Sequence, residues 1–362
     1  MRRACNLAYD RGVQKQVRTL ATLLVVCALF APLHGLTQTR DGQHDFDFNF
    51  GTWQTQIKRL QHPLTRTTAW VEYSGQVTVR KVWGGSASLE EIEANGAGHL
   101  EIMNLRMYDP KSHQWSLNGT GSGDGMLGSP MYGDFRNGRG VFYDQEPFNG
   151  RTVLVRQTFS DITAHTYSFE QAYSSDGGTT WQPNFVAHLT RLSALAPSEG
   201  ALSIADTSHD FDFNYGTWMT HIKSLHQAPD GSKTWNELNG TVAVRKIWNG
   251  RALMEEIKAA NASGGFEGLT LLLYDPQSHQ WSQTYADRSD GTFDPSMIGD
   301  FKDGRGELVG QARYGGKAVL MRDAWSDIKA EAHDFEVAYS DDGGRHWQPT
   351  FIAALRRAGP GL

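Results

Sequence analysis

The chain has 362 residues, 39 of them glycine and 11 tryptophan, and a formal net charge of −6. A negative chain is a poor candidate for binding nucleic acid, because nucleic-acid-binding surfaces carry clustered lysine and arginine. The two cysteines, Cys5 and Cys27, both lie near the N-terminus. The rest of the chain therefore has no disulfide, no thiolate nucleophile and no cysteine-based metal site.

Residues 1–35 have the features of a signal peptide. Its basic residues are Arg2, Arg3, Arg11, Lys15 and Arg18. The apolar stretch 20–33 that follows is short for a membrane span, so we expect cleavage just after Gly35, although an uncleaved anchor is an alternative. Removing five basic residues and one acidic residue changes the net charge from −6 to −10. We expect a periplasmic or secreted protein without stable membrane insertion after cleavage.

The remainder of the chain is a tandem repeat. Residues 44–53 return almost unchanged as 209–218, and the two halves stay aligned nearly to the C-terminus. A repeat of this length corresponds to a whole domain rather than to a solenoid unit. We predict a first domain over 44–191, a linker over 192–208 and a second domain over 209–357.

Neither domain shows the apolar spacing of a helix. Short alternating stretches are separated by Gly, Asn, Asp and Pro, which indicates an all-β fold. The clearest hairpin surrounds Asn249 and Gly250, a pair typical of a type I′ turn, and Gly84 and Gly85 occupy the same place in the first half.

The hairpin fixes a register and suggests which face points inward. In the first domain the expected partners are Val82 with Ala87, Arg80 with Leu89, and Thr78 with Glu91. In the second they are Ile247 with Ala252, Arg245 with Met254, and Ala243 with Glu256. This face is mostly apolar, so we expect it to face the interior, with Glu90 and Glu255 facing outward.

The ends of each domain carry a second repeated pattern. Gly-Thr-Trp opens each half, and an arginine after an apolar run closes it. The pattern resembles the calycins, including lipocalins and fatty-acid-binding proteins, where the first-strand indole packs under a basic side chain from the last strand. The resemblance implies two tandem antiparallel calycin-like (lipocalin-like) β-barrels. It also implies a structural role for four residues: Trp53, Arg191, Trp218 and Arg357.

The full set of repeated motifs resembles one family more specifically. Besides Gly-Thr-Trp, both halves carry Val-Arg-Lys-x-Trp, Tyr-Asp-Pro, Gly-Arg-Gly, Ser-Asp-Ile and Asp-Gly-Gly-x-x-Trp. Together they resemble an uncharacterised bacterial domain family of exported, calycin-like proteins. The resemblance implies fold and compartment, and it brings no agreed activity.

The leading functional hypothesis is a non-enzymatic binder of a small apolar or amphipathic molecule. The candidate ligand-binding residues are Arg80, Glu91, Trp83, Trp115, Arg245, Glu256, Trp248 and Trp281. The arginine–glutamate pairs either bind the polar head of the ligand or only order the core. Two alternatives remain: a hydratase, cyclase or isomerase with Glu91 or Glu256 as general acid, and a solid interaction module without ligand.

No metal, cofactor or catalytic residue is assigned. The chain lacks His-Glu-x-x-His, a two-histidine-one-carboxylate spacing and Gly-x-Ser-x-Gly. His188, near the end of the first domain, resembles the haem histidine of nitrobindin-type barrels, but the Gly-x-Trp-x-Gly-x-Gly opening of that family is absent. Residues 174–181 match a sialidase Asp-box. With one copy per domain, a hairpin turn is the favoured interpretation.

Overall fold

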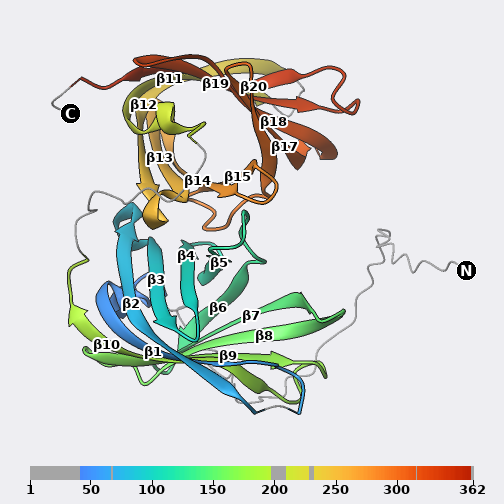
Figure 1. Ribbon diagram of the computed structural model, residues 1–362. Helices are drawn as coiled ribbons and strands as arrows, with labels where there is room; N and C mark the ends of the chain where they lie inside the picture. Colours follow the sequence, from blue (N-terminus) through green and yellow to red (C-terminus); the bar gives the residue numbers. More distant parts are fainter. Residues whose placement is uncertain (1–40, 67, 197–208, 228–231, 315, 360–362) are drawn as a thin grey trace, which may run out of the picture. The chain divides into compact units, whose positions relative to one another are not determined.

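The computed structural model describes residues 41–66, 68–196, 209–227, 232–314 and 316–359. They form two closed antiparallel β-barrels of ten strands each (Figure 1). The all-β class and the tandem barrel architecture expected from the sequence are thereby confirmed. The expected signal peptide and most of the expected linker lie outside the described residues.

Barrel 1 consists of the first ten strands and barrel 2 of the next ten. The strands of barrel 1 are β1 (Gly51–Leu60), β2 (Trp70–Val82), β3 (Ala87–Gly96), β4 (His99–Asp109), β5 (Gln114–Gly121), β6 (Met131–Arg136), β7 (Arg139–Phe148), β8 (Arg151–Ser160), β9 (Thr166–Ser174) and β10 (Gln182–Ser193). Those of barrel 2 are β11 (Gly216–Gln227), β12 (Lys233–Ile247), β13 (Ala252–Asn261), β14 (Gly264–Asp275), β15 (Gln280–Asp287), β16 (Met297–Lys302), β17 (Arg305–Tyr314), β18 (Lys317–Lys329), β19 (Ala332–Ser340) and β20 (Gln348–Arg357).

Short turns connect the strands in sequence order, and the first strand of each barrel pairs with the last. The predicted β12–β13 register is confirmed, with Ile247 opposite Ala252. Asn249 and Gly250 both have positive φ, and the Arg251 N–H donates to the Trp248 carbonyl, which is the geometry of a type I′ turn. The β2–β3 hairpin has the same register and turn.

A cation–π contact lies at the seam of each barrel. Trp53 on β1 is directly opposite Arg191 on β10, and the guanidinium carbon lies 4.0 Å from the centre of the indole ring. Arg191 also donates hydrogen bonds to the carbonyls of Phe48 and Phe50. In barrel 2 the Arg357 guanidinium carbon lies 4.0 Å from the centre of the Trp218 indole ring. The indole is fully buried, so its shielded contact with arginine fastens the first strand to the last.

Gly51, two residues before Trp53, permits this seam. Its φ of +115° belongs to a region that favours glycine, and a Cβ there would lie 2.2 Å from the Ser193 carbonyl oxygen. The glycine of the Gly-Thr-Trp motif is therefore required by close approach of the last strand.

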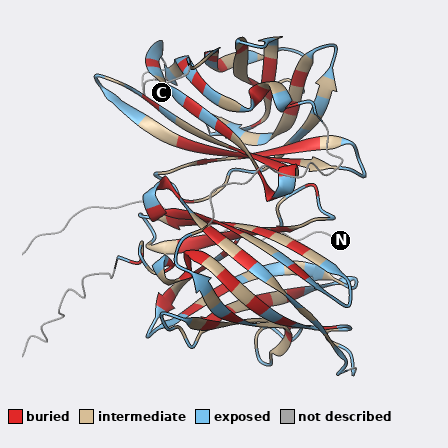
Figure 2. Ribbon diagram, turned by 60° about the vertical axis from the view of Figure 1, so that its left-hand side comes forward, coloured by how far each residue is buried: buried red, intermediate tan, exposed pale blue. Residues whose placement is uncertain are grey.

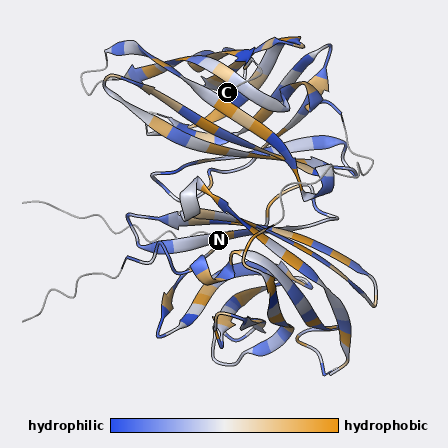
Figure 3. Ribbon diagram, turned by 90° about the vertical axis from the view of Figure 1, so that its left-hand side faces the viewer, coloured by the Kyte–Doolittle hydropathy of each residue, from blue (hydrophilic) through white to orange (hydrophobic). Residues whose placement is uncertain are grey.

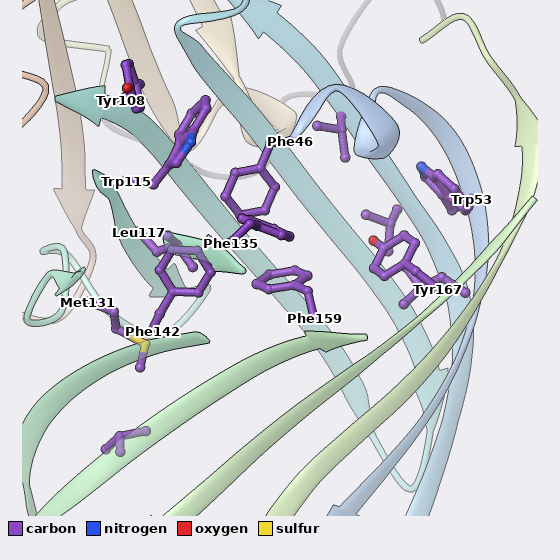
Figure 4. Packing of buried hydrophobic residues seen from close by; sticks show 14 of the residues in the cluster. Phe46, Trp53, Tyr108, Trp115, Leu117, Met131, Phe135, Phe142, Phe159 and Tyr167 are labelled. Atoms are coloured by element: carbon purple, nitrogen blue, oxygen red, sulfur yellow. The ribbon is translucent and has the colours of Figure 1, made fainter. Parts of the chain in front are cut away.

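A short segment before the first strand fills one end of each barrel. In barrel 1, Phe46 precedes the 3₁₀ turn η1 (Asp47–Asn49). Its ring packs edge-to-face against Trp115, Phe135 and Phe159, with 4.9–5.2 Å between ring centres (Figure 4). In barrel 2, Phe211 occupies the equivalent position before η3 (Asp212–Asn214). Burial of such a ring stabilises the fold by about 1.5–3 kcal/mol. We call Phe46 with η1 the plug of barrel 1.

Parts of β3 and β4, and of their counterparts β13 and β14, are buried on both faces, whereas most other strands alternate between more and less buried residues (Figure 2). Apolar residues are distributed along the strands of both barrels (Figure 3). Where a strand is buried on both faces, one face lines the barrel interior. The other face joins a second cluster that contains residues of both barrels: Val82, Trp83, Ala87, Leu89, Met103, Leu105, Met107, Ile247, Trp248, Ala252, Met254, Leu269, Leu271, Leu273 and Ala286. The outer faces of these strands therefore pack against each other within the compact unit Arg40–Leu362. We call this contact the inter-barrel junction.

Matched hydrogen bonds flank the inter-barrel junction. The Ser116 hydroxyl on β5 donates to the carbonyl of Gly291 at 2.9 Å, and the Ser282 hydroxyl on β15 donates to the carbonyl of Gly125 at 2.6 Å. The two serines are equivalent in the repeat, as are the two glycines. The two hydrogen bonds are therefore equivalent: in each, a β5-type serine of one barrel donates to the matching glycine carbonyl of the other.

The Asp-box segment forms the turn between β9 and β10, so the turn interpretation is confirmed. The Asp176 carboxylate accepts bonds from the backbone N–H of Thr180 at 2.9 Å and from its hydroxyl at 2.7 Å. Trp181 packs against Arg156, with 4.6 Å between guanidinium carbon and ring centre.

No helix among the described residues is long and apolar enough to cross a membrane.

We expect Arg191→Met to lower the free energy of unfolding by about 2–4 kcal/mol, because the cation–π contact and the charged hydrogen bonds to two carbonyls are lost. Arg357→Met should have a similar effect. The control is Arg136→Met, whose side chain is 82% exposed and should change stability by less than about 0.5 kcal/mol. Urea denaturation measures all three. Equal effects at Arg191 and Arg136 would contradict the role of the seam.

Candidate functional site

The candidate pairs taken from the sequence lie outside the barrels. Arg80 and Glu91 do form an ion pair, on the outer face of β2 and β3 at the inter-barrel junction. The Glu91 carboxylate accepts a hydrogen bond from the backbone N–H of Trp248 at 2.6 Å. Arg245 and Glu256 pair in the same way on barrel 2. The expectation that this face points inward is wrong.

The physical reason is that the outer face of these strands packs against the second barrel and is therefore apolar. Apolar character alone could not distinguish that face from one that lines a barrel interior. The same error placed Glu90 and Glu255 outside, whereas both carboxylates lie inside their barrels. Arg80 and Glu91 instead line a groove of about 180 Å³ at the junction, and ligand binding by these pairs stays a prediction.

The four candidate tryptophans divide into two sets. Trp83 and Trp248 belong to the inter-barrel junction. Trp115 and Trp281 lie inside the barrels against the N-terminal segments, where the Trp115 indole N–H donates to the Gly42 carbonyl at 2.9 Å. These contacts are structural, and ligand contact by the tryptophans remains a prediction.

Barrel 1 contains a cavity of about 940 Å³. It begins beyond the plug and runs along β1 from Thr55 to the exposed Arg59. Its apolar wall includes Ile57, Val77, Ile92, Phe159, Phe169 and Phe185. Polar side chains such as Gln157, Gln171 and Asn184 line it as well. The volume lies in the range of about 300–1,000 Å³ found for small-molecule sites.

A buried ion pair forms the polar end of this cavity, next to the plug. Arg106 on β4 and Glu90 on β3 are 2% and 4% exposed and bind each other through Nη2 and Oε2. Asn104, opposite Glu90 across the strands, donates to the same carboxylate at 2.7 Å. The guanidinium also lies over the rings of Phe46 and Phe159, 4.8 and 5.5 Å from their centres.

Further polar groups complete the cluster around Arg106. Arg106 donates to the Asn49 side-chain carbonyl at 3.4 Å, and the Asn49 amide donates to the Tyr167 hydroxyl at 3.0 Å. Burial raises the pKa of Tyr167, so its hydroxyl stays protonated. The Arg106 Nε–H has no hydrogen-bond partner among the described residues. We call Arg106, Glu90, Asn104, Asn49 and Tyr167 the polar cluster.

A second carboxyl pair lies farther along the same barrel. Asp144 and Glu146 are two residues apart on β7, so both project from one face of the strand. Glu146 lines the cavity. Burial, together with repulsion from Glu146, raises the pKa of Asp144 to about 7. The pair can therefore hold or release a proton near neutral pH.

His188 does not face the cavity. It is exposed on β10, while its neighbours Ala187 and Leu189 line the interior. Its position gives no geometric basis for a haem ligand inside the barrel. Within the described ranges, no group of three or more His, Cys, Asp or Glu side chains could hold a metal ion.

The sequence reasoning missed Arg106, the central residue of the cluster. The search favoured residues kept in both halves, and the counterpart of Arg106 is Leu272. A signal did exist: Arg106 is a lone charge in a run of Met, Asn, Leu and Met, where a charge needs a buried partner. The neighbouring Glu90-Glu91 dipeptide supplies one carboxylate to each face of β3.

No protein-family model matches the chain, and no curated protein matches its sequence. Among solved structures, a protein of unknown function from the DUF3598 family of Nostoc punctiforme is similar over 88% of this chain and 100% of its own. Its sequence identity is 12% and its TM-score 0.25. A mutant of transferrin binding protein B from Haemophilus parasuis is similar over 84% of this chain and 75% of its own, with 9% identity and a TM-score of 0.18. At such TM-scores nothing about this chain's activity follows.

The two ten-stranded barrels themselves fit the uncharacterised calycin-like family that the sequence motifs resemble. What the fold establishes is a tandem β-barrel protein with a large cavity in barrel 1.

The ion pair should show strong coupling. Arg106→Met or Glu90→Gln alone leaves one buried charge without its partner and should cost about 3–5 kcal/mol of unfolding free energy. The double variant should lose less than the sum, with a coupling above about 1 kcal/mol in urea denaturation. The matched control is Arg80→Met with Glu91→Gln, a more exposed pair whose coupling should be smaller. Additive costs at Arg106 and Glu90 would refute the pairing.

Asp144 should make stability depend on pH. Its folded-state pKa of about 7 lies above the ordinary value, so the protonated form is favoured on folding, and stability is lost as pH rises through about 7. Asp144→Asn should therefore melt at a higher temperature than the parent at pH 8, and no higher at pH 4. The exposed Asp341→Asn is the control. A gain of the same size at both pH values would show that ionisation is not the cause.

Proposed function

We propose that barrel 1 binds a small amphipathic molecule, with an uncharged polar group at the polar cluster and an apolar body along the cavity wall. The observation that carries this proposal is the Arg106–Glu90 pair, buried at one end of a cavity of about 940 Å³ that has both polar and apolar walls. Binding outside the cytoplasm is part of the proposal and rests on the N-terminal export signal.

The charge balance of the polar cluster selects the head group. Glu90 already neutralises Arg106, so an anionic head would gain attraction from one and meet repulsion from the other in a medium of low dielectric. An uncharged group such as an amide, ketone or alcohol avoids this conflict. It can accept from the Arg106 Nε–H, which lacks a partner among the described residues.

The apolar wall sets the rest of the ligand. Aromatic and branched side chains surround the cavity beyond the cluster, so a hydrocarbon or ring system would gain about 25 cal/mol for each Å² of apolar surface removed from water. The ligand's body would extend toward Arg59 and the exposed end of β1.

The test uses the protein purified gently from its own host and measured by native mass spectrometry. We expect a bound small molecule on the parent, and about tenfold or greater weakening of its rebinding by the double variant Arg106→Met, Glu90→Gln. The matched control, Arg80→Met with Glu91→Gln, should bind as the parent does. If Arg80→Met with Glu91→Gln abolished binding and Arg106→Met with Glu90→Gln did not, the ligand would bind at the inter-barrel junction and the proposal would be wrong.

An acid–base enzyme on the same ligand is the second candidate, favoured by the Asp144–Glu146 pair and its pKa near neutrality. Incubation of the released ligand with fresh protein distinguishes the two. An unchanged ligand mass and structure supports the binder. A product that forms with the parent and not with Asp144→Asn supports the enzyme.

A further inference from the structure

Barrel 2 keeps the acceptors of the polar cluster but lacks its cation. Glu255 and Asn214 stand where barrel 1 has Glu90 and Asn49. Asn214 is buried, and the half-buried Glu255 accepts a hydrogen bond from its amide. In barrel 1 the Arg106 guanidinium donates to both counterparts. In barrel 2 the equivalent residue is Leu272, which has no donor to offer.

The consequence is a set of buried acceptors without partners. Among the described residues, the side-chain carbonyls of Asn214 and Gln283 and the Oδ1 atom of Asp323 have no hydrogen bond, although each residue is at most 4% exposed. Buried polar groups in folded proteins are nearly always paired, so each of these atoms requires a donor. In the same interior, Nδ1 of His333 and the Thr220 hydroxyl have no hydrogen-bond partner within the described part of the chain.

The charge of the barrel 2 interior also favours a cationic ligand. Barrel 2 has gained a second interior carboxylate, because Asp323 replaces Gln157, and it has lost the arginine. Asp323 binds the Gln283 amide, and Glu255 binds the Asn214 amide at 3.0 Å. Neither contact brings a positive charge. His333 is neutral at physiological pH because burial and the nearby arginines lower its pKa to about 4.

We propose that the interior of barrel 2 binds a small organic cation, with an ammonium or guanidinium group that donates to Glu255, Asn214 and Asp323 as Arg106 donates within barrel 1. The cation's N–H groups would pair with the Asn214 and Asp323 oxygens, which lack a donor among the described residues, and with the Glu255 carboxylate. Trp325, buried in the same interior, offers apolar contact to the ligand's body.

Protons compete with such a ligand. Burial raises the pKa of Glu255 to about 7 and that of Asp323 to about 8, the latter also through repulsion by Glu255. The carboxyls are then largely protonated below pH 7, and a bound cation must displace those protons. Affinity should therefore rise between pH 6 and pH 9. Tyr285 also faces this interior, and burial holds its pKa far above this range, so it does not contribute.

The first experiment measures the melting temperature and calorimetric binding of the mature chain with butylammonium and with methylguanidinium. Butanol is the neutral control, and tetramethylammonium is a cation without N–H donors. We expect stabilisation by the first two alone, stronger at pH 9 than at pH 6, with proton release on binding. No stabilisation by either compound across this pH range would overturn the proposal, as would an equal effect of butanol.

Variants locate the site. Leu272→Arg gives barrel 2 its own cation and should weaken amine binding by more than about tenfold while raising the melting temperature. Leu272→Met, of similar length without charge, should bind amines as the parent does. If Leu272→Arg does not fold, Glu255→Gln with Asp323→Asn removes both carboxylates at constant size and should abolish binding. Unchanged binding in that variant would overturn the proposal.

This inference is independent of the ligand proposed for barrel 1, and the same variants separate the two. The double variant Arg106→Met, Glu90→Gln should keep the full response to amines, because its changes lie in the other interior. An amine response lost in that variant and kept in Leu272→Arg would assign the cation to barrel 1 instead and overturn the proposal.

Discussion

The inter-barrel junction constrains everything else in this protein. Because parts of β2–β4 and β12–β14 are buried on both faces, alternate positions of these strands serve either the contact with the other barrel or the interior. Glu90 and Glu91 divide in this way, one to each side. The junction thus decides which charged side chains are available to a ligand within a barrel.

The two interiors share a framework and differ in charge. Both keep the seam between first and last strands, the phenylalanine beside the 3₁₀ turn, and a glutamate on the third strand. They differ at Arg106 and Leu272, and at Gln157 and Asp323. One interior pairs its glutamate with an arginine and contains a large cavity, whereas the other holds two carboxyls and no arginine at the matching position. Two barrels with one fold thus have chemically different interiors.

The repeat made the fold readable from the sequence. The sequence predicts the all-β class from its short alternating stretches. It also predicts the Asn249-Gly250 turn and the register of the strands beside it, because local turn chemistry determines both. The inward face was not, since the prediction assumed that an apolar face belongs to a barrel interior. The candidate site moved with that error from Glu91 to Glu90. Arg106 was missed because it occurs in one half only. Residues that are identical in both halves identify the shared fold, whereas a site present in one barrel depends on residues that differ.

The exchanged bonds of Ser116 with Gly291 and of Ser282 with Gly125 have an evolutionary consequence. A contact that each side both gives and receives is the signature of a two-fold symmetric homodimer. The two barrels of this one chain accordingly meet as the subunits of such a dimer do, with pseudo-two-fold symmetry. In a homodimer every substitution appears in both subunits at once. In a single chain the two copies can differ, and here one interior has Arg106 where the other has Leu272.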